Sequence, residues 1–246
     1  MQKKIALVTG GLGGIGQEIC ARLGKEGYVV VSTFMRAGRD EAWTKQMKDL
    51  GVEAKAYQCD VSKFEDAQAL IENIKKDFGS NVSVLVNNAG ITKDGTLRKM
   101  TVDQWQDVIN TNLNSVFNLS KAVVDDMTTN GFGRIINISS INGQKGQFGQ
   151  TNYSAAKAGM HGFTMALAQE VAKKGVTVNT ISPGYIATEM VMAVPEDIRN
   201  QIIAQIPVNR LGKPQEIASL VTYLSSEDAG FITGSNIAIN GGQHMK

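Results

Sequence analysis

The chain has 246 residues, of which 42% are hydrophobic and 20% are charged. This composition is typical of a globular protein with a sizeable core, and doubly wound α/β folds of this length often form one domain. The 25 basic and 23 acidic residues give a net charge of +2, which excludes a general attraction to nucleic acid or to an anionic membrane surface. We expect a single domain over residues 1–246.

Metal binding and membrane insertion are not expected either. The chain has two cysteines, Cys20 and Cys59, without CxxC spacing, and two histidines, so His and Cys cannot form a metal-ligand cluster. The first apolar run, residues 5–8, is too short for a signal-peptide core, and no run is long enough to cross a bilayer. These features predict a cytoplasmic enzyme with reduced thiols and no metal.

Short runs rich in Val and Ile alternate with longer helical patterns along the chain. Continuously apolar runs are typical of parallel strands covered on both faces, and intervening helices supply the crossover connections. The fold class is therefore α/β, a Rossmann-type doubly wound parallel sheet of about seven strands with helices on both faces. The expected strands are residues 5–8, 29–31, 84–86, 135–138, 176–181 and 237–239. The expected helices are residues 14–26, 41–50, 64–78, 102–128, 152–174 and 214–225.

Residues 184–212 break this alternation. They contain an apolar run, Pro195 and an amphipathic series formed by Ile198, Ile202 and Ile206. We interpret this segment as a small mobile lid over the substrate site. An ordinary surface helix is the alternative.

A glycine-rich turn follows the first predicted strand. The sequence Thr9-Gly10-Gly11-Leu12-Gly13-Gly14-Ile15-Gly16 leads directly into a predicted helix. At such a position glycines allow a tight turn, and the free N–H groups of the helix attract a dinucleotide pyrophosphate. A literal G-x-G-x-x-G pattern is weak by itself and falls on Gly11, Gly13 and Gly16, so the strand-turn-helix context carries this prediction.

The end of the second predicted strand indicates which dinucleotide is bound. An NAD enzyme usually has Asp or Glu there, to bind the ribose hydroxyls, whereas this chain has Ser32-Thr33-Phe34-Met35-Arg36-Ala37-Gly38-Arg39. Guanidinium groups form forked, charge-assisted hydrogen bonds with a phosphate. The sequence therefore favours NADPH/NADP+, with Arg36 and Arg39 near the 2′-phosphate. The alternative is that both are solvated loop charges.

A Tyr and a Lys lie four residues apart in the helix predicted over residues 152–174. Tyr153 and Lys157 share one helix face, so an ammonium group would lie near the phenol. The phenol pKa is about 10 in isolation, and a neighbouring positive charge lowers it toward neutral pH. Tyr153 is thereby predicted as a general acid, although a packed phenol beside a solvated lysine would have the same spacing.

Together with several ordered motifs, this pair resembles the short-chain dehydrogenase/reductase family over nearly the whole chain. The motifs are Thr9-Gly10 with Gly14-Ile15-Gly16, Asp60-Val61, Asn87-Asn88-Ala89-Gly90, Asn112, Ser140, Tyr153 with Lys157, and Pro183-Gly184. The spacing of Ser140 to Tyr153 matches the family and favours Ser140 over Ser139. The resemblance implies that Ser140 and Tyr153 bind a carbonyl oxygen, that the nicotinamide supplies hydride, and that Tyr153 donates the proton.

The resemblance also implies a role for each matching residue. The catalytic set is Asn112, holding a water in a proton relay, with Ser140, Tyr153 and Lys157. The cofactor set is Gly10, Gly14, Ile15, Gly16, Arg36, Arg39, Asp60, Val61, Asn88, Gly90, Tyr153, Lys157, Pro183, Gly184, Ile186 and Thr188. Asp60 would bind the adenine, Asn88 and Gly90 would border its ribose, and Lys157 would hold the nicotinamide ribose.

Structural alternatives remain for some of these residues. The alternatives are that Asp60 caps a helix in place of binding adenine, that the Asn-Asn-Ala-Gly run is a strand-end turn, and that Asn112 braces its helix. One position departs from the family. Many NADP-using members have Arg or Lys where this chain has Gly13, so Arg39 is the preferred partner of the 2′-phosphate.

The stretch 142–153, with residues 161–170 and 183–188, is similar to the acetoacetyl-CoA reductases of polyhydroxybutyrate synthesis. These reduce a 3-oxoacyl-CoA to the (R)-3-hydroxyacyl-CoA with NADPH. The predicted substrate-binding residues are Asp94, Ser140, Gln147, Phe148, Gln150, Tyr153 and Tyr185. Gln147 and Gln150 would bind polar oxygen atoms, while Phe148 and Tyr185 would form apolar walls. Gln and aromatic loop residues are as often surface or packing groups.

Two other functions and one assembly are compatible with these motifs. A 3-oxoacyl-acyl-carrier-protein reductase of fatty acid synthesis has nearly the same motifs. A non-catalytic NADP-binding sensor or scaffold usually lacks part of the Asn, Ser, Tyr and Lys set, which is complete here. Small residues at Ala155, Ala156, Ala158 and Gly159 allow close helix approach and, by resemblance, a homotetramer. Packing of that helix on its own sheet is the alternative.

Overall fold

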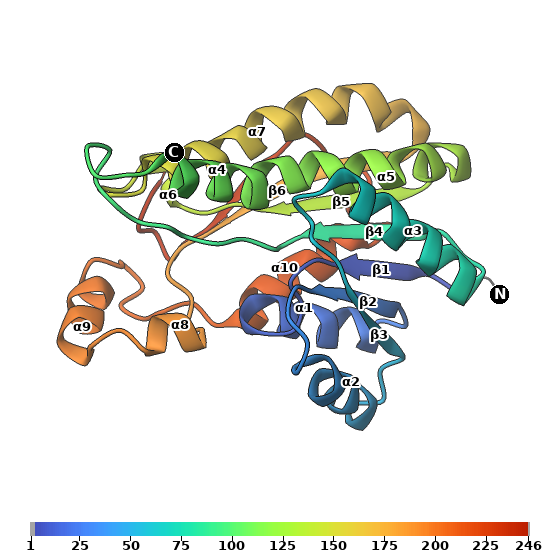
Figure 1. The fold of residues 1–246 in the computed structure, drawn as a ribbon, viewed down its shortest axis with the longest axis horizontal. Coiled ribbons are helices and arrows are strands. Elements are labelled where there is room, and N and C mark those ends of the chain that lie inside the picture. Colours follow the sequence, from blue (N-terminus) through green and yellow to red (C-terminus); the bar gives the residue numbers. More distant parts are fainter. Residues whose placement is uncertain (1–2, 246) are drawn as a thin grey trace.

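A computed structural model describes residues 3–245 as one seven-stranded parallel sheet with helices on both faces (Figure 1). The strands lie in the order β3-β2-β1-β4-β5-β6-β7. Their bounds are β1 Ile5–Val8, β2 Val29–Phe34, β3 Ala54–Gln58, β4 Val82–Asn87, β5 Gly133–Ile138, β6 Val176–Pro183 and β7 Asn236–Ile239. The doubly wound parallel sheet predicted from the sequence is confirmed.

The chain reverses direction across the sheet at β1. From β1 it runs outward through β2 to the edge strand β3, and it then returns to β4 on the other side of β1. In open α/β sheets the crevice at such a switch point, outside the carboxyl ends of the strands, is where ligands bind. The loops after β1 and β4 therefore border the expected site.

The helices form two layers. One layer, with α3, α5 and α7, covers one face of the sheet, and the other layer, with α1, α2 and α10, covers the opposite face (Figure 1). The helix α4 packs beside α7. The bounds of the helices are α1 Gly14–Lys25, α2 Asp40–Asp49, α3 Phe64–Phe78, α4 Val102–Ile109, α5 Ser115–Asn130, α6 Asn142–Lys145, α7 Thr151–Val171, α8 Glu189–Met192, α9 Glu196–Ala204 and α10 Pro214–Ser225. A π-helical turn, Asn110–Asn114, separates α4 from α5, and a 3-10 turn, Ala172–Lys174, follows α7. Within residues 3–245, no helix combines the length and apolar character needed to span a membrane.

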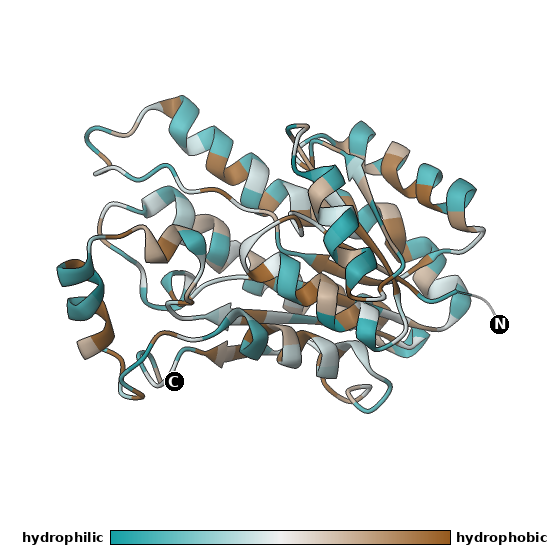
Figure 2. Cartoon of the chain, turned by 90° about the horizontal axis from the view of Figure 1, so that it is seen from below, coloured by the Kyte–Doolittle hydropathy of each residue, from teal (hydrophilic) through white to brown (hydrophobic). Residues whose placement is uncertain are grey.

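Each face of the sheet has its own hydrophobic core. Leu7 and its neighbours on one face pack with residues of α3, α5 and α7, while Val8 and its neighbours on the other face pack with residues of α1, α2 and α10. Figure 2 shows the result, with hydrophobic strands enclosed between helices whose outer faces are hydrophilic. Because both faces are covered, the central strands are continuously apolar in sequence.

The short helices α6 and α8 were not expected from the sequence, and three longer elements differ from the expectation. The strand β3 was missed, because it lies at the sheet edge and its residues, Ala54–Gln58, are only partly buried or exposed, which removes the apolar run. The helix expected over residues 102–128 is divided by the π-helical turn at Asn110–Asn114. The helix expected over residues 152–174 ends at Val171 and continues as the 3-10 turn.

The segment 184–212 is closed at its base. Ile186 and Gly212 form an isolated bridge, with Ala187 N–H donating to the Gly212 carbonyl at 2.8 Å and Gly212 N–H donating to the Tyr185 carbonyl at 2.9 Å. The helices α8 and α9 project from this base beside the strand ends (Figure 1). Of the predicted amphipathic series, only Ile206 is buried, and Ile198 is exposed. The lid function stays a prediction.

Candidate active site

The glycine turn after β1 is shaped for close backbone approach. Gly10 and Gly14 have φ values of +65° and +55°, which side-chain-bearing residues rarely adopt. A Cβ atom at Gly16 would lie 2.6 Å from the Gly10 carbonyl oxygen. The N-cap of α1, Gly13, offers no side-chain hydrogen bond, so the first N–H groups of α1 are available to an anion. The turn fits a dinucleotide pyrophosphate.

Two side chains hold this turn against β4. The Thr9 hydroxyl accepts hydrogen bonds from the N–H groups of Asn88 and Ala89, both at 3.0 Å. The Asn88 amide donates to the carbonyls of Thr9 at 3.0 Å and Gly10 at 3.2 Å. The Asn-Asn-Ala-Gly run is therefore a strand-end brace for the glycine turn. Asn88 also lines the cavity described below.

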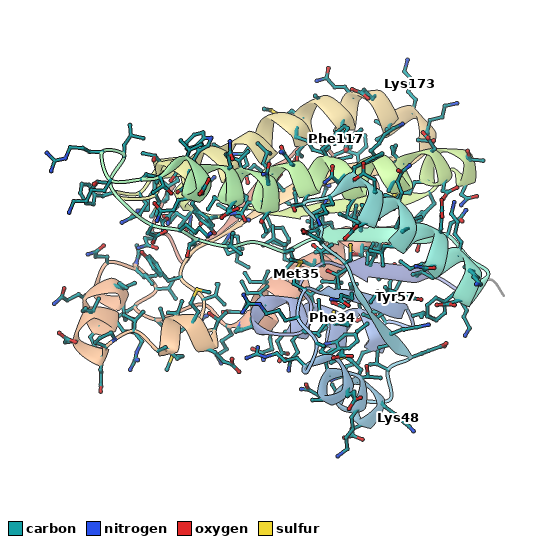
Figure 3. All side chains as sticks on the ribbon, in the orientation of Figure 1. Phe34, Met35, Lys48, Tyr57, Phe117 and Lys173 are labelled. Atoms are coloured by element: carbon teal, nitrogen blue, oxygen red, sulfur yellow. The ribbon has the colours of Figure 1, made fainter. Side chains whose placement is uncertain are left out.

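The residues predicted around the adenine end lie at the carboxyl ends of β2 and β3. Figure 3 labels Phe34 and Met35 where β2 ends, and Met35 is exposed. Arg36 and Arg39 are exposed in the following loop, and a Cβ atom at Gly13 would lie 3.8 Å from Arg39 Nη1. The Arg39 guanidinium thus lies beside the turn, on the side where Gly13 leaves space.

Asp60 has local partners after β3. Its carboxylate accepts hydrogen bonds from the Ser62 N–H at 3.1 Å and the Ser62 hydroxyl at 2.6 Å, which forms a local Asx-type turn. The alternative that Asp60 caps a helix is wrong, because the N-cap of α3 is Lys63 and has no side-chain cap hydrogen bond. The adjacent Val61 is buried, and its carbonyl accepts a hydrogen bond from Asn118. Adenine binding by Asp60 and Val61 stays a prediction.

A cavity of about 280 Å³ opens where β1, β4, β5 and β6 end. It brings together twelve residues predicted for the site with residues that sequence analysis did not select. The predicted residues are Ile15, Asn88, Gly90, Ser140, Gln150, Tyr153, Lys157, Tyr185, Ile186 and Thr188, with Pro183 and Gly184 completing that wall. Gly10, Gly14 and Gly16 lie outside the lining, in the adjoining turn.

Within the cavity, α7 presents Tyr153 and Lys157 one turn apart, as their spacing predicts. The Lys157 Nζ atom lies 5.6 Å from the centroid of the Tyr153 ring and donates a hydrogen bond to the Ile138 carbonyl at 2.7 Å. The Ser140 hydroxyl interacts with the Tyr153 phenol and lowers its pKa, and it accepts a hydrogen bond from the Asn142 N–H at 3.1 Å. A hydroxyl, a phenol and an amine therefore face one space, as carbonyl protonation requires.

Burial shifts the pKa values of both Lys157 and Tyr153. Burial lowers the pKa of Lys157 to about 7, and it raises the pKa of Tyr153, which the Ser140 hydrogen bond partly offsets and the charge of Asp94 reinforces. The sequence-based expectation that Lys157 would lower the phenol pKa is wrong for the protein alone. Loss of solvent disfavours the phenolate. The same burial lowers the pKa of Lys157, so less of the ammonium form is present to stabilise the phenolate.

Asn112 lies behind the cavity in the π-helical turn and is fully buried. Its side-chain oxygen accepts from the Ile91 N–H at 2.8 Å, and its amide donates to the Ile91 carbonyl at 2.9 Å. The side chain thus braces the loop after β4. A role of Asn112 in a water relay stays a prediction.

Of the three predicted substrate residues in the loop before α7, Gln150 lines the cavity, whereas Gln147 and Phe148 do not. The Gln150 amide donates to Asp94 at 2.8 Å and accepts from Asn142 at 2.9 Å, so it connects two loops at the cavity. Phe148 is 86% exposed and does not line the cavity. Gln147 is exposed and accepts from Lys145 at 3.2 Å. Contacts of Gln147 and Phe148 with substrate stay predictions.

Several lining residues were missed by sequence analysis. They are Ile91, Thr92, Ile138, Ser139, Ile141, Asn142, Met190 and Val191. Met190 and Val191 belong to the apolar run within residues 184–212, and this run was a signal from which their place in the cavity wall could have been predicted. Ile91 and Thr92 carry no comparable signal, because their loop reaches the cavity only through tertiary contacts such as the Asn112 bond.

The chain matches the profile of the short chain dehydrogenase family over residues 4–199. It belongs to this family. The chain is 56% identical over 246 residues to an acetoacetyl-CoA reductase of Cupriavidus necator, with 100% of both chains covered. It is 53% identical over 244 residues to an acetoacetyl-CoA reductase of Allochromatium vinosum, covering 98% of this chain and 99% of the relative. A 3-oxoacyl-[acyl-carrier-protein] reductase of Pseudomonas aeruginosa is 47% identical over 245 residues, covering 100% and 99%.

This short-chain dehydrogenase is therefore an oxidoreductase that uses a nicotinamide cofactor. The observed turn is consistent with that assignment, since the Cβ-intolerant Gly16 and the uncapped start of α1 leave backbone N–H groups for a pyrophosphate.

Proposed function

We propose that this protein reduces acetoacetyl-CoA, and other short 3-oxoacyl-CoA thioesters, to the (R)-3-hydroxyacyl-CoA with NADPH, and that its product feeds polyhydroxybutyrate synthesis. The observation that carries the proposal is the convergence of Ser140, Tyr153 and Lys157 in one cavity next to the glycine turn. The relatives named acetoacetyl-CoA reductase, 56% and 53% identical over almost the whole chain, support the substrate.

In the proposed mechanism, the Ser140 hydroxyl and the Tyr153 phenol orient the substrate carbonyl by binding its oxygen. The cofactor supplies a hydride to the carbonyl carbon when bound. Tyr153 then donates its proton to the developing alkoxide, for which a neutral phenol is the required form. The raised pKa of Tyr153 in the protein alone keeps that proton in place before reduction. Lys157 stabilises the phenolate that remains and binds the nicotinamide ribose hydroxyls.

The preference for NADPH rests on the loop after β2. No carboxylate occurs from Ser32 to Arg39, and the Arg39 guanidinium lies beside Gly13. A 2′-phosphate there would receive a charge-assisted hydrogen bond. Comparing kcat/KM for NADPH and NADH tests this assignment, and equal or better use of NADH would overturn it.

The carrier of the acyl group is tested by a direct comparison. Acetoacetyl-CoA and acetoacetyl-acyl-carrier protein are offered with NADPH, and the product is analysed by chiral chromatography. We expect a higher kcat/KM for the CoA thioester and an (R) product. A higher kcat/KM for the carrier-protein thioester would favour the activity named in the Pseudomonas aeruginosa relative.

We also infer that the enzyme is a cytoplasmic homotetramer, that residues 1–246 form one domain, and that residues 184–212 act as its lid. Exposed Ala155 and Ala158 on α7 support a subunit contact along this helix. Gly159 supports the alternative, since its missing Cβ makes room for Leu113 of the same chain. Light scattering coupled to gel filtration measures the assembly, and a monomeric mass would refute it.

A further inference from the structure

The helix α7 is attached to the sheet through polar contacts at successive turns. Below Tyr153, Lys157 donates to the Ile138 carbonyl. One turn further, the His161 Nε2 atom lies 3.0 Å from the Ser139 hydroxyl and 3.4 Å from the Ser182 hydroxyl. Further along, Thr164 bonds to Asn137 at 2.9 Å and to Thr180 at 2.7 Å. Of these contacts, the one made by His161 is closest to Ser140 along the chain, because its partner Ser139 directly precedes Ser140.

The hydrogen positions at this contact follow from the partners of the two hydroxyls. The Ser139 hydroxyl donates to the Lys157 carbonyl at 2.8 Å, and the Ser182 hydroxyl donates to the Asn236 side-chain oxygen at 2.7 Å. Each serine hydroxyl has a single hydrogen, so both oxygens can only accept from the imidazole. His161 Nε2 must therefore carry hydrogen and donate it to Ser139, with Ser182 as the longer second acceptor.

This arrangement connects the helix that carries Tyr153 to the strand end that carries Ser140. Ser139 is buried, its N–H donates to the Ile181 carbonyl of β6 at 2.8 Å, and its hydroxyl is held by two groups of α7, the Lys157 carbonyl and the His161 imidazole. Ser140 follows directly in the chain, and both serines line the cavity. Because a fixed Ser139 restricts the backbone that it shares with Ser140, these contacts limit where the Ser140 hydroxyl can lie relative to the Tyr153 phenol.

We propose that His161 is a positioning residue of the reductase, which donates its Nε2 hydrogen to Ser139 and thereby holds Ser140 in hydrogen-bonding register with Tyr153. This inference rests on the proposed function only in its kinetic test, which requires that the protein reduce a 3-oxoacyl thioester. His161 contacts neither the carbonyl nor the cofactor in this scheme. Its loss should impair the chemical step and leave the binding of both substrates nearly unchanged.

Three variants separate positioning from simple stability. His161→Leu removes the donor, while His161→Gln retains an N–H that reaches nearly the same place. Thr164→Val is the matched control, because it breaks a neighbouring polar contact between α7 and the sheet without touching Ser139. We expect kcat to fall roughly tenfold in His161→Leu, since small misplacements of reacting groups are costly, with both KM values within about twofold. His161→Gln should recover most of kcat, and Thr164→Val should keep it.

A second readout needs no substrate. Titration of the Tyr153 phenol, followed by NMR in protein labelled with carbon-13 tyrosine, reports whether Ser140 still bonds to it. Lys157 and Asp94 are the charged groups that face this phenol, and neither is altered. Because the Ser140 bond lowers the pKa of Tyr153, the phenol should ionise at higher pH in His161→Leu than in the unaltered protein or in His161→Gln.

The two proposals fail in different ways. If the unaltered protein reduces neither thioester, the proposed function is wrong, and the phenol titration still tests the positioning role. If the protein is active but His161→Leu matches Thr164→Val in kcat and in phenol titration, the positioning role is wrong. Failure of His161→Gln to improve on His161→Leu would also overturn it.

Discussion

Replacing Lys157 by Met should change how the stability of the protein depends on pH. Burial lowers the Lys157 pKa from 10.5 to about 7, whereas the unfolded chain keeps the ordinary value. Between these two values the unfolded state binds more protons, so the free energy of unfolding rises with pH. Below about pH 7 both states are protonated and the dependence ends. The full difference of roughly 3.5 pKa units corresponds to about 5 kcal/mol.

Between about pH 7.5 and about pH 9.5, the unfolding free energy of the unaltered protein should rise by about 2 to 3 kcal/mol relative to Lys157→Met. The variant has no ammonium at this position, and it loses the hydrogen bond to Ile138 and the contact with the Tyr153 ring. Urea unfolding of the cofactor-free protein, followed by circular dichroism at fixed protein concentration, measures both values.

The exposed Lys173 provides a matched control, since Figure 3 shows it extending away from the protein beyond α7. Lys173→Met removes a positive charge from an exposed position. Its unfolding free energy should therefore change with pH in the same way as that of the unaltered protein. A difference between the unaltered protein and Lys157→Met that is constant from about pH 7.5 to about pH 9.5 would refute the buried-ammonium argument.

Three further substitutions test the site. Tyr153→Phe should lower kcat by about two to four orders of magnitude through loss of the general acid, with the NADPH dissociation constant unchanged in a fluorescence titration; near-normal turnover would remove Tyr153 from its role. Gly16→Ala should abolish NADPH binding, because its Cβ would lie 2.6 Å from the Gly10 carbonyl oxygen, whereas Gly162→Ala, which faces open space, should bind normally. Arg39→Ala should raise the KM for NADPH about tenfold or more, as expected for a lost charged hydrogen bond, and leave the KM for NADH unchanged; equal effects on both would contradict 2′-phosphate binding.

The sequence predicts best what depends on local pattern or on an ordered motif. The central strands are recognisable because burial on both faces makes them continuously apolar, as in β1 and β5. The glycine turn is recognisable from its place between a strand and a helix. The literal pattern starting at Gly11 was out of register. Gly10 and Gly14 have the left-handed backbone, while Gly11 packs against Ser32 and Cys20.

What the sequence could not provide depends on tertiary burial. The direction of the Tyr153 pKa shift is set by solvent exclusion, which the spacing to Lys157 does not reveal. The loop of Ile91 reaches the cavity through a bond to Asn112, which is 21 residues away in sequence. The edge strand β3 has too little burial to leave an apolar run. Each of these properties is decided by neighbours that are distant along the chain.

The bridge between Ile186 and Gly212 fixes the two ends of the intervening segment next to each other. We call this bridge the neck of the segment. The sheet supports the two ends of the neck, and among residues 3–245 the hydrogen-bonding partners of Ser140, Tyr153 and Lys157 lie outside the segment that the neck closes. The entropic cost of closing a loop grows only slowly with its length. Insertions, deletions and exchanges beyond the neck can therefore accumulate without moving the reacting groups. Evolution, or an engineer, can thus alter the range of accepted acyl chains on this scaffold while the reduction chemistry is kept.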